Sequence, residues 1–466
     1  MEGGLAMAVW STINMSYGLS NKRLDAERYK PQFLNNEKYL SSIKWDYLKK
    51  YIVDISGGAT PKGAKYPNDG IKFVRVQNIR DNYFDLSDVV YIDNAIHSGQ
   101  LLRSQIKESD VLLTITGSYG NSSVAFAEML PANINQHSVR IALKKGLLPE
   151  FLSTFLCCKY GHLQSDSKIT GDTRPALTYP EIGNYMIPIL DIQYQREIQN
   201  IVRKSLEQRL LSQSLYQQAE ELLEKELRLD SLKLTNQKVY QAGYSDVMAN
   251  GRVDAEFYNP QLIQCYKYFS NEVSLKLKPI TNFLVVKKFS NPIYANNGVP
   301  IITQRHLSNI SPENYGDYPL ADSIWCNRNN DALLKLNDLL FYSVGAYLGK
   351  TNIWLNDDDA VFASFITLLR CYNPIDSCFL MLLLNSSFGT LQSNVFKSGT
   401  SQPYIYPKDI KQFMVPDVDV TVKQALDDLI HKSYNSKQQS KLLLEQAKHR
   451  VEELIEQEAT KTTLKI

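Results

Sequence analysis

The amino-acid sequence contains one module twice, with a period of about 228 residues, and this repeat constrains the fold more than any other feature. Four short motifs return in the same order in the second half of the chain. Two copies of one module predict two similar domains, each with a core of its own. The matched segments are residues 23–27 and 252–256, 70–77 and 298–304, 109–119 and 337–347, and 171–182 and 399–410.

A long stretch that closes the first copy predicts a helix. After Pro188, roughly thirty residues contain no glycine or proline, and apolar side chains recur every three or four positions. Pro188 stands just before the helix, where its missing N–H costs little. Charged and amide side chains occupy the opposite face, so this helix needs a single partner. The apolar positions are Ile198, Ile201, Val202, Leu206, Leu210, Leu215, Ala219, Leu222 and Leu223.

The same pattern closes the second copy, over residues 422–458, and Pro416 precedes it. Two long helices with one apolar stripe each are most simply satisfied by pairing as a coiled coil. An antiparallel pair would give the duplicated chain a pseudo-twofold arrangement. Two unrelated surface helices are the alternative. The apolar positions are Val422, Leu426, Leu429, Ile430, Tyr434, Leu443, Ala447, Val451, Leu454 and Ile455.

Each copy is predicted to be a mixed globule followed by its helix, so the expected fold class is α+β. Residues 111–115 and 339–342 are short apolar runs bounded by Asp and Gly, as strands are. Residues 151–160 and 379–384 suit buried helices, and the polar residues 230–250 suit a linker. The predicted domains are a globule over 1–190, a helix over 191–235, a globule over 236–418 and a helix over 419–466.

Composition places few further limits on function. The chain has 466 residues, 44% of them hydrophobic, and a formal net charge of only +2, which does not indicate a nucleic-acid binder by itself. Its six cysteines form no CxxC pair and no metal-ligand spacing with the histidines, so reduced thiols in a cytoplasmic protein are expected. We expect no signal peptide and no membrane span.

The motifs and their order resemble the specificity subunit of type I restriction–modification systems. The motifs are Arg23-Leu-Asp-Ala-Glu-Arg-Tyr29, Gly117-Ser-Tyr-Gly120 and Gly171-Asp-Thr-Arg-Pro-Ala-Leu-Thr-Tyr-Pro180, and the order is globule, long helix, globule, long helix. The resemblance covers residues 16–456. It implies two target-recognition domains that each read half of a bipartite DNA site, with paired helices that set the spacer.

The resemblance also implies partners and cofactors. A specificity subunit of this family docks two methyltransferase subunits, and with them restriction subunits, and it carries no catalysis of its own. AdoMet, ATP and Mg²⁺ would then be bound by the partner subunits, and we expect no cofactor or metal in this chain. The complex would act in bacterial defence by DNA modification. Double-stranded DNA is the expected ligand.

Motifs for catalysis are weak. Asn291-Pro-Ile-Tyr294 only approaches an adenine-methyltransferase motif, and Glu150 with Asp166-Ser-Lys168 forms a nuclease-like pair of a kind that arises often by chance. Asp110 and Asp338 recur just before the predicted strands, which fits turn chemistry better than acid–base chemistry.

The repeat sorts candidate DNA-contacting residues. Positions that both copies share should serve the fold or the phosphates, and positions that differ should read bases. The shared polar pairs are Gln77 with Gln304, Tyr119 with Tyr347 and Tyr179 with Tyr406. The differing pairs are Asn78 with Arg305, Ile79 with His306, Ser118 with Ala346 and Arg174 with Gln402. Arg140 and Lys397 are further phosphate candidates. The expected DNA-binding set is Arg75, Gln77, Asn78, Arg80, Ser118, Tyr119, Arg174, Gln304, Arg305, His306, Tyr347, Lys350 and Gln402.

Other readings of the sequence stay open. The near-neutral charge predicts weak non-specific DNA binding by the isolated chain, so partner subunits should supply much of the DNA clamp. The same type of chain also suits a system in which methyltransferase and nuclease are fused in one polypeptide. A two-headed protein-binding scaffold without a DNA role is the more distant alternative.

Overall fold

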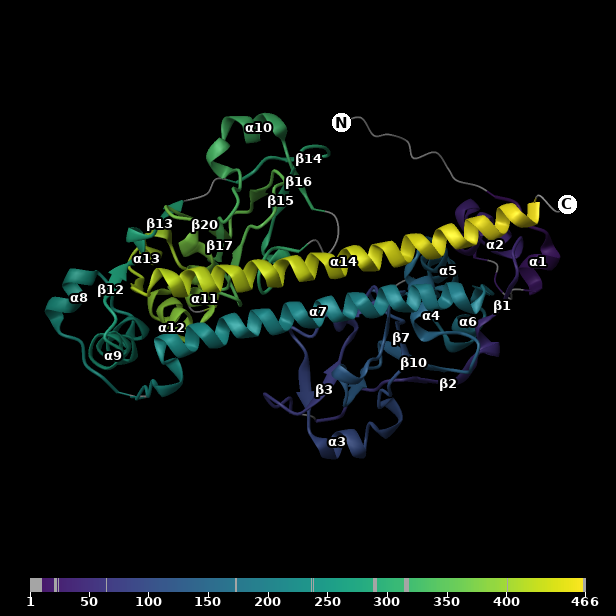
Figure 1. Cartoon of the computed structure of the whole chain (residues 1–466), viewed down its shortest axis with the longest axis horizontal. Coiled ribbons are helices and arrows are strands. Elements are labelled where there is room, and N and C mark those ends of the chain that lie inside the picture. The colour runs from purple at the N-terminus through teal and green to yellow at the C-terminus, as the bar shows by residue number, and fades with distance from the viewer. Residues whose placement is uncertain are drawn as a thin grey trace. The chain divides into compact units, whose positions relative to one another are not determined.

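Two long helices, α7 (Ile192–Leu227) and α14 (Val420–Thr463), are the longest elements of the computed structural model (Figure 1). The structure describes residues 11–20, 23, 25–63, 65–171, 174–235, 237, 239–287, 291–313, 318–399 and 401–463. The chain divides into unit 1 (Met1–Gln208 and Gln438–Ile466) and unit 2 (Arg209–Lys437). Each unit therefore contains one part of α7 and one part of α14. No helix within the described ranges is long and apolar enough to cross a membrane.

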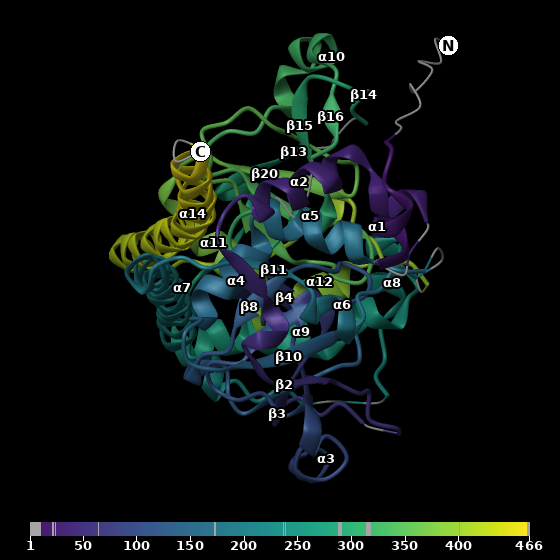
Figure 2. The same cartoon turned by 90° about the vertical axis from the view of Figure 1, so that its right-hand side faces the viewer.

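Unit 1 contains a four-stranded antiparallel sheet with the order β2-β10-β7-β8 and a three-stranded sheet with the order β6-β3-β9. In the smaller sheet β3 pairs parallel with β9 and antiparallel with β6. Helix α4 packs on β7 and β8, and Figure 2 shows α4 beside β8. The strands are β1 (Trp45–Tyr47), β2 (Ile52–Gly57), β3 (Ile71–Val74), β4 (Ile79–Arg80), β5 (Tyr83–Phe84), β6 (Val90–Ile92), β7 (Val111–Thr114), β8 (Ser122–Val124), β9 (Ala132–Ile134), β10 (Ser138–Leu143) and β11 (Met186–Pro188). The other helices are α1 (Met15–Ser20), α2 (Pro31–Ser41), α3 (Asn94–Ser98), α4 (Pro149–Cys157), α5 (Lys159–Lys168) and α6 (Tyr179–Gly183).

Unit 2 repeats this topology. Its larger sheet has the order β13-β20-β17-β18, and its second sheet, β14-β16-β15-β19, again pairs one strand parallel, β15 with β19. The strands are β12 (Leu277–Pro279), β13 (Leu284–Lys287), β14 (Tyr294–Ala295), β15 (Val299–Ile302), β16 (Leu320–Ala321), β17 (Leu339–Tyr342), β18 (Thr351–Ile353), β19 (Val361–Phe362), β20 (Ile366–Cys371) and β21 (Met414–Pro416). The helices are α8 (Tyr244–Asn250), α9 (Pro260–Tyr268), α10 (Ser323–Arg328), α11 (Ile375–Asn385), α12 (Ser387–Phe396) and α13 (Pro407–Ile410). The predicted α+β class and the duplication are both confirmed.

Some of the predicted strands and helices lie at the predicted residues, and others do not. Strands β7 and β17 lie where they were predicted, and both are buried along their whole length. The expected helix over 151–160 is instead two helices, because Cys158 is extended and the chain turns sharply into α5. A Cβ on Gly161 would lie 2.2 Å from the carbonyl oxygen of Phe155, so this corner needs glycine. The predicted linker over 230–250 contains helix α8.

The two long helices pair antiparallel, as predicted. In unit 1, Ser205 Oγ lies 2.9 Å from Ser440 Oγ, and Arg450 Nε lies 2.7 Å from Glu197 Oε1. Residue numbers therefore fall along α14 as they rise along α7. Ile198 and Val202 of α7 join Val451 and Ile455 of α14 in the core of unit 1, whereas Leu223 of α7 and Leu426 of α14 belong to the core of unit 2.

Buried serines take part in this pairing, which the predicted apolar stripe did not include. In unit 2, Ser212 Oγ lies 3.1 Å from Ser433 Oγ, the repeat equivalent of the contact between Ser205 and Ser440. All four serines are buried, whereas Leu210, which the stripe included, is half-buried. Small side chains let two helices approach closely, and the hydroxyls satisfy one another where they are removed from water.

Candidate nucleic-acid interface

A glycine-containing loop follows the buried strand β7 in unit 1 and β17 in unit 2. Gly117 (φ +72°) and Gly120 (φ +89°) in unit 1, and Gly345 (φ +107°) and Gly349 (φ +90°) in unit 2, have left-handed backbone conformations. The loops close alike, because the N–H of Gly120 donates to Thr114 O (3.0 Å) and that of Gly349 to Tyr342 O (2.9 Å). The scaffold exposes Ser118 in one unit and Ala346 in the other at the same position.

The tyrosines of these loops have different surroundings. Tyr119 is half-buried and packs against the core of unit 1, and burial together with the nearby Asp166 carboxylate raises its pKa. Tyr347 is 66% exposed, with its ring edge-on to Tyr342 and Lys350 Nζ 6.0 Å from the ring centroid. Tyr347 therefore offers an aromatic face to solvent beside a cation, whereas Tyr119 also serves packing.

A short 3-10 turn follows β3 in unit 1 and β15 in unit 2, and its third residue is fully buried. Asn78 Oδ1 accepts from the N–H of Arg75 (2.9 Å), and Asn78 Nδ2 donates to Asp85 O (2.9 Å) and Asp88 Oδ1 (2.6 Å). Asn78 and His306 are both 0% exposed. Their side chains hold the turn in place, and in this conformation neither is at the surface.

In unit 2 the ring of His306 has the role that the Asn78 amide has in unit 1. His306 Nδ1 accepts from the N–H of Thr303 (2.9 Å). Burial, together with the adjacent Arg305, lowers the pKa of His306 to about 4, so the ring is a neutral acceptor at pH 7.

The structure corrects the pairing of the copies at this turn. The turns span Val76–Asn78 and Gln304–His306, so Asn78 matches His306 and Gln77 matches Arg305. Matching the two copies by sequence paired Gln77 with Gln304 and required a gap of one residue in the second copy. The backbone has no such gap. The offset is 228 here, as it is between Gly70 and Gly298. Gln77 and Arg305 are both exposed, so the position that differs at the surface is theirs.

The same shift affects the tyrosines at the start of α6 and α13. The residue that caps α6 is Thr178, and the residue that caps α13 is Tyr406, so Tyr406 matches Thr178 and not Tyr179. The Tyr-Pro dipeptide is shifted by one position between the two copies. Matching identical residues therefore paired the wrong tyrosines.

A hairpin carries Arg174 in unit 1 and Gln402 in unit 2. Thr170 and Ala176 exchange two backbone hydrogen bonds of 2.9 Å, and Ser398 and Tyr404 form the equivalent pair. Arg174 and Gln402 are exposed at the tip of the hairpin. Asp172, Thr173 and Thr400 of this motif lie outside the described residues.

Hydrogen bonds join these segments into one surface in each unit. The N–H of Leu177, at the end of the first hairpin, donates to Ile115 O in the loop after β7 (2.9 Å), and Ile405 donates to Ser343 O in the same way (2.9 Å). Gln304 Nε2 donates to Val344 O (3.4 Å), which connects the 3-10 turn of unit 2 with the loop after β17. In unit 1, Asn121 Nδ2 of the loop after β7 donates to Ile79 O, directly after the 3-10 turn (3.3 Å). The segments that carry the predicted residues of each unit are therefore joined, although most are far apart in sequence.

Several of the basic candidate residues form ion pairs with carboxylates of the same chain. Arg140 is buried, with Nη1 3.1 Å from Asp110 Oδ2 and Nη2 against Asp54, so it holds the sheet together and is not a surface contact for phosphate. Arg75 Nη2 lies 3.2 Å from Asp88 Oδ2, and Gln77 Nε2 donates to the same oxygen (2.9 Å). Arg80 and Lys350 are half-buried at the edge of this surface.

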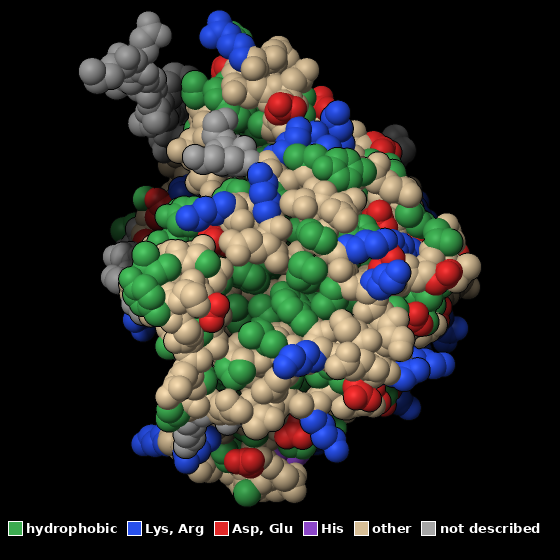
Figure 3. All heavy atoms as spheres, turned by 90° about the vertical axis from the view of Figure 1, so that its left-hand side faces the viewer, with side chains coloured by type: hydrophobic (Ala, Val, Ile, Leu, Met, Phe, Trp, Pro, Cys, Tyr) green, Lys and Arg blue, Asp and Glu red, His purple; other side chains and the backbone are tan. Residues whose placement is uncertain are grey.

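On one face of the molecule, charges of both signs are interspersed (Figure 3). Figure 3 shows one face, on which Lys and Arg lie among Asp, Glu and apolar side chains without a continuous basic patch. This agrees with the net charge of +2.

A cleft in unit 1 beside the hairpin was missed by the sequence analysis. It has a volume of about 530 Å³, and Arg23, Arg28, Lys168, Thr170 and Glu181 are among its lining residues. Burial, followed by the charge of Arg28, lowers the pKa of Lys168 to about 8. The repeated Arg-x-Asp motif was the available signal. Arg23 Nε donates to Asp25 Oδ1 (2.8 Å), as Arg252 Nε does to Asp254 Oδ1 (2.9 Å).

The structure thus defines a duplicated α+β protein with paired long helices and one loop surface in each unit. No protein-family model matches the chain. A stretch of 134 residues, 28% of the chain, is 30% identical to the type I restriction enzyme EcoBI specificity subunit of Escherichia coli. This match spans 27% of that relative's length. The resemblance to specificity subunits that the motifs indicated is therefore confirmed by a sequence match.

Solved structures of specificity subunits also match. The S subunit of the type I restriction–modification system from M. genitalium is 12% identical, with 89% of this chain and 95% of that chain covered and a TM-score of 0.43. The HsdS subunit from Thermoanaerobacter tengcongensis is 14% identical, with 89% and 96% covered and a TM-score of 0.27.

Proposed function

We propose that this chain is the non-catalytic DNA-recognition subunit of a type I restriction–modification complex, and that each unit reads one half of a bipartite site. The observation that carries the proposal is the contrast between the two loop surfaces. Their buried supports correspond, as with Asn78 and His306, while their exposed side chains differ, as with Gln77 and Arg305. A duplicated scaffold with different surface residues suits two readers of different sequences.

The chemistry of the differing residues fits base readout. Arginine presents two donors to guanine O6 and N7, and glutamine pairs with adenine N6 and N7. Arg305 and Gln402 in unit 2 are the repeat equivalents of Gln77 and Arg174 in unit 1, so the two units would prefer different bases. The exposed Tyr347 beside Lys350 would contact the DNA of the second half-site.

Partners complete the proposed activity. Two methyltransferase subunits and the restriction subunits would dock on this chain, with the paired helices setting the spacer between the half-sites. AdoMet, ATP and Mg²⁺ would be bound by those partners, and the assembly would act in the cytoplasm. Base methylation requires the adenine to leave the stack, which is a task for the methyltransferase. Because Arg75 and Arg140 are paired with carboxylates, the partners would also supply much of the clamp on the phosphates.

Methylation sequencing of DNA from cells with and without this gene tests the proposal directly. A bipartite N6-methyladenine motif should be present with the gene and vanish without it. An unchanged methylome in cells that produce an active partner methyltransferase would contradict the proposal. Mobility shift of duplex DNA by the reconstituted complex separates a DNA reader from a protein-binding scaffold.

Two matched substitutions test which residues read DNA. Arg305→Gln should change the methylated motif in one half-site only, and Gln77→Arg should change only the other. If both substitutions altered the same half-site, the assignment of one half-site to each unit would be wrong. A partner that carries methyltransferase and nuclease in one polypeptide would give the same results, and copurification would identify it by mass.

A further inference from the structure

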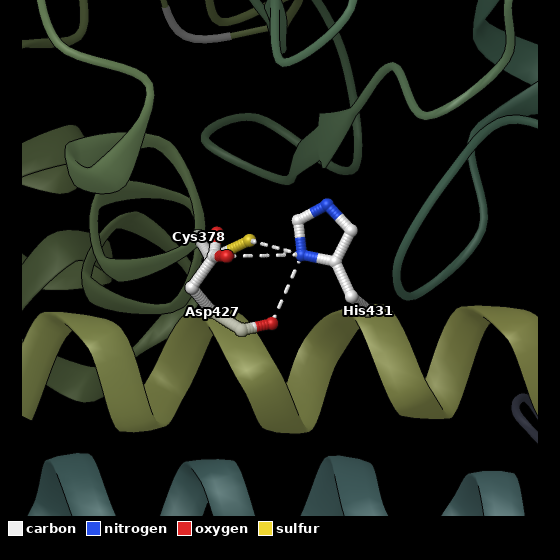
Figure 4. A group of neighbouring side chains, drawn as sticks. All are labelled: Cys378, Asp427 and His431. Carbon is white, nitrogen blue, oxygen red and sulfur yellow. Dashed lines mark hydrogen bonds and ion pairs between the residues drawn. The ribbon is translucent and has the colours of Figure 1, made fainter.

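Three side chains of metal-ligating type converge in unit 2, away from the loop surface. Cys378 lies on α11, and Asp427 and His431 lie one turn apart on α14. The Cys378 Sγ, an Asp427 carboxylate oxygen and a His431 ring nitrogen all lie within 4.8 Å of one another. Figure 4 shows the thiol and the carboxylate pointing at the same ring nitrogen, Nδ1.

The arrangement of the three side chains suits a shared ion better than a catalytic triad. His431 Nδ1 lies 3.3 Å from Asp427 Oδ2 and 4.0 Å from Cys378 Sγ. Neighbouring ligands of a tetrahedral zinc ion lie about 3.2–3.7 Å apart, given bond lengths of about 2.0–2.3 Å, so the distance to Asp427 is within this range and the distance to Cys378 is slightly longer. A nucleophile–histidine–carboxylate triad uses both ring nitrogens, one for each partner. Here both partners meet Nδ1, so the three side chains do not form that relay, and their convergence suits a shared cation.

The first repeat provides an internal comparison. The residues at the equivalent positions, 228 earlier, are Glu150, Gln199 and Arg203. Glu150 is buried and accepts from Gln199 Nε2 (3.0 Å) and Arg203 Nε (2.8 Å), so its charge is already neutralised by protein donors. This position therefore joins a long helix to a helix of the globule in both units, α7 to α4 in unit 1 and α14 to α11 in unit 2. In unit 2 all three residues are replaced by types that bind transition metals.

Access and charge also suit an ion. Cys378 is buried, but the side chains of Asp427 and His431 are 22% and 37% exposed, so water reaches the group and can occupy a fourth position. Burial, followed by the Asp427 charge, raises the pKa of the Cys378 thiol, so without a cation the sulfur stays protonated. Lys423, one helical turn before Asp427 on α14, is paired with Asp376 at 2.7 Å.

We propose that unit 2 binds one zinc-type divalent transition-metal ion through Cys378 Sγ, the Asp427 carboxylate and His431 Nδ1, with water as the fourth ligand. Binding breaks the S–H bond of Cys378 and releases its proton to solvent, with no change of oxidation state. In the bound form the neutral His431 carries its proton on Nε2, and Nδ1 exchanges its 3.0 Å contact with Asp427 O for the metal. The ion joins α11 to α14, and this inference does not depend on the DNA-reading proposal.

Cobalt(II) titration of the metal-free full-length chain tests this site. One equivalent should produce a thiolate-to-cobalt charge-transfer band and tetrahedral ligand-field bands, and zinc should displace the cobalt and raise the thermal unfolding midpoint. Cys378→Ser should abolish the charge-transfer band, and His431→Gln should weaken binding at least tenfold. The matched controls Cys371→Ser and His449→Gln should bind as the unsubstituted chain does.

Failure of a variant to fold would not leave the question open. Asp427→Asn replaces a half-buried side chain with one of equal size, and it should also weaken cobalt binding at unchanged helical circular dichroism. Absence of a thiolate band in the unsubstituted chain, or its persistence in folded Cys378→Ser, would overturn the proposal. Loss of the band in Cys371→Ser with retention in Cys378→Ser would do so too.

Discussion

The buried carboxylate of Asp338 supports the start of β17, and Asp338→Asn is expected to destabilise unit 2 strongly. Asp338 is 1% exposed and accepts from the N–H of Lys335 (2.7 Å) and from Arg370 Nε (2.7 Å) and Nη2 (2.6 Å). These bonds hold the turn before β17 and neutralise the arginine. The amide of asparagine keeps one acceptor but removes the charge and points N–H groups at Arg370.

The magnitude follows from what happens to Arg370. Removing one partner of a buried ion pair costs about 3–5 kcal/mol, because the other charge is left uncompensated. The Arg370 side chain is 19% exposed and Nη2 also donates to Leu333 O (3.0 Å), so partial solvation places the cost near the lower limit. We expect a loss of about 3 kcal/mol in the free energy of unfolding of unit 2, a large part of the roughly 5–15 kcal/mol typical of a domain.

Urea unfolding followed by tryptophan fluorescence measures this loss. Trp354 is buried in unit 2 and its backbone N–H donates to the backbone oxygen of Asp338 (2.8 Å), so it reports on the affected region. Asp331→Asn is the matched control, because Asp331 pairs with Lys287 but is exposed, and its unfolding curve should be unchanged. Asp338→Leu combined with Arg370→Met should recover most of the loss, since no buried charge remains. Equal curves for Asp338→Asn and the control, or a double variant as unstable as Asp338→Asn, would refute this reasoning.

Four further outcomes are expected. Asn78→Ala should lower the unfolding free energy of unit 1 by about 2 kcal/mol in urea unfolding, because buried hydrogen-bond partners lose their acceptor and donors. Tyr347→Ala should leave stability within about 0.5 kcal/mol but weaken DNA binding by the complex about tenfold in fluorescence anisotropy. Lys168→Met should raise stability below pH 8 by on the order of 3 kcal/mol. That gain should shrink as the pH rises from about 8 to 10.5, since the unfolded lysine then also loses its proton, and equal gains at pH 7 and pH 10 would contradict the assignment. Seven residues inserted in α7 after Gln208 and seven in α14 after Lys437 should lengthen the recognised spacer by about 3 base pairs, at ~1.5 Å per helical residue. Methylation sequencing that showed altered half-sites instead would contradict the role of the helices.

Periodic burial made the architecture predictable from the sequence. The apolar positions of the long helices and the short apolar runs of β7 and β17 are patterns among neighbouring residues. Such patterns can be recognised in the sequence without knowledge of the tertiary structure. The break at Cys158 was not predictable in the same way, because Cys158 is itself buried and apolar and neither glycine nor proline stands at the break. Only the close approach of Gly161 to the preceding helix shows why the chain turns there.

The surface residues were predictable as a set but not as individuals. Asn78 and Gln77 are neighbours in an irregular turn, where no period tells which side chain points inward. The structure buries Asn78 and exposes Gln77, and it does the same with His306 and Arg305. Arg140 was expected at the surface and lies inside, because its partner Asp110 comes from a different part of the chain.

The sequence by itself determined the duplication, the mixed α+β class, the two paired helices and the resemblance to specificity subunits, because repeats, periodicity and motifs are properties of neighbouring residues. Tertiary structure alone decided which polar side chains face solvent, that serines meet between α7 and α14, and that Cys378 reaches His431 from 53 residues away. The physical reason is that a contact between distant segments depends on how whole elements pack, and the residues that form it carry no local mark of their partner.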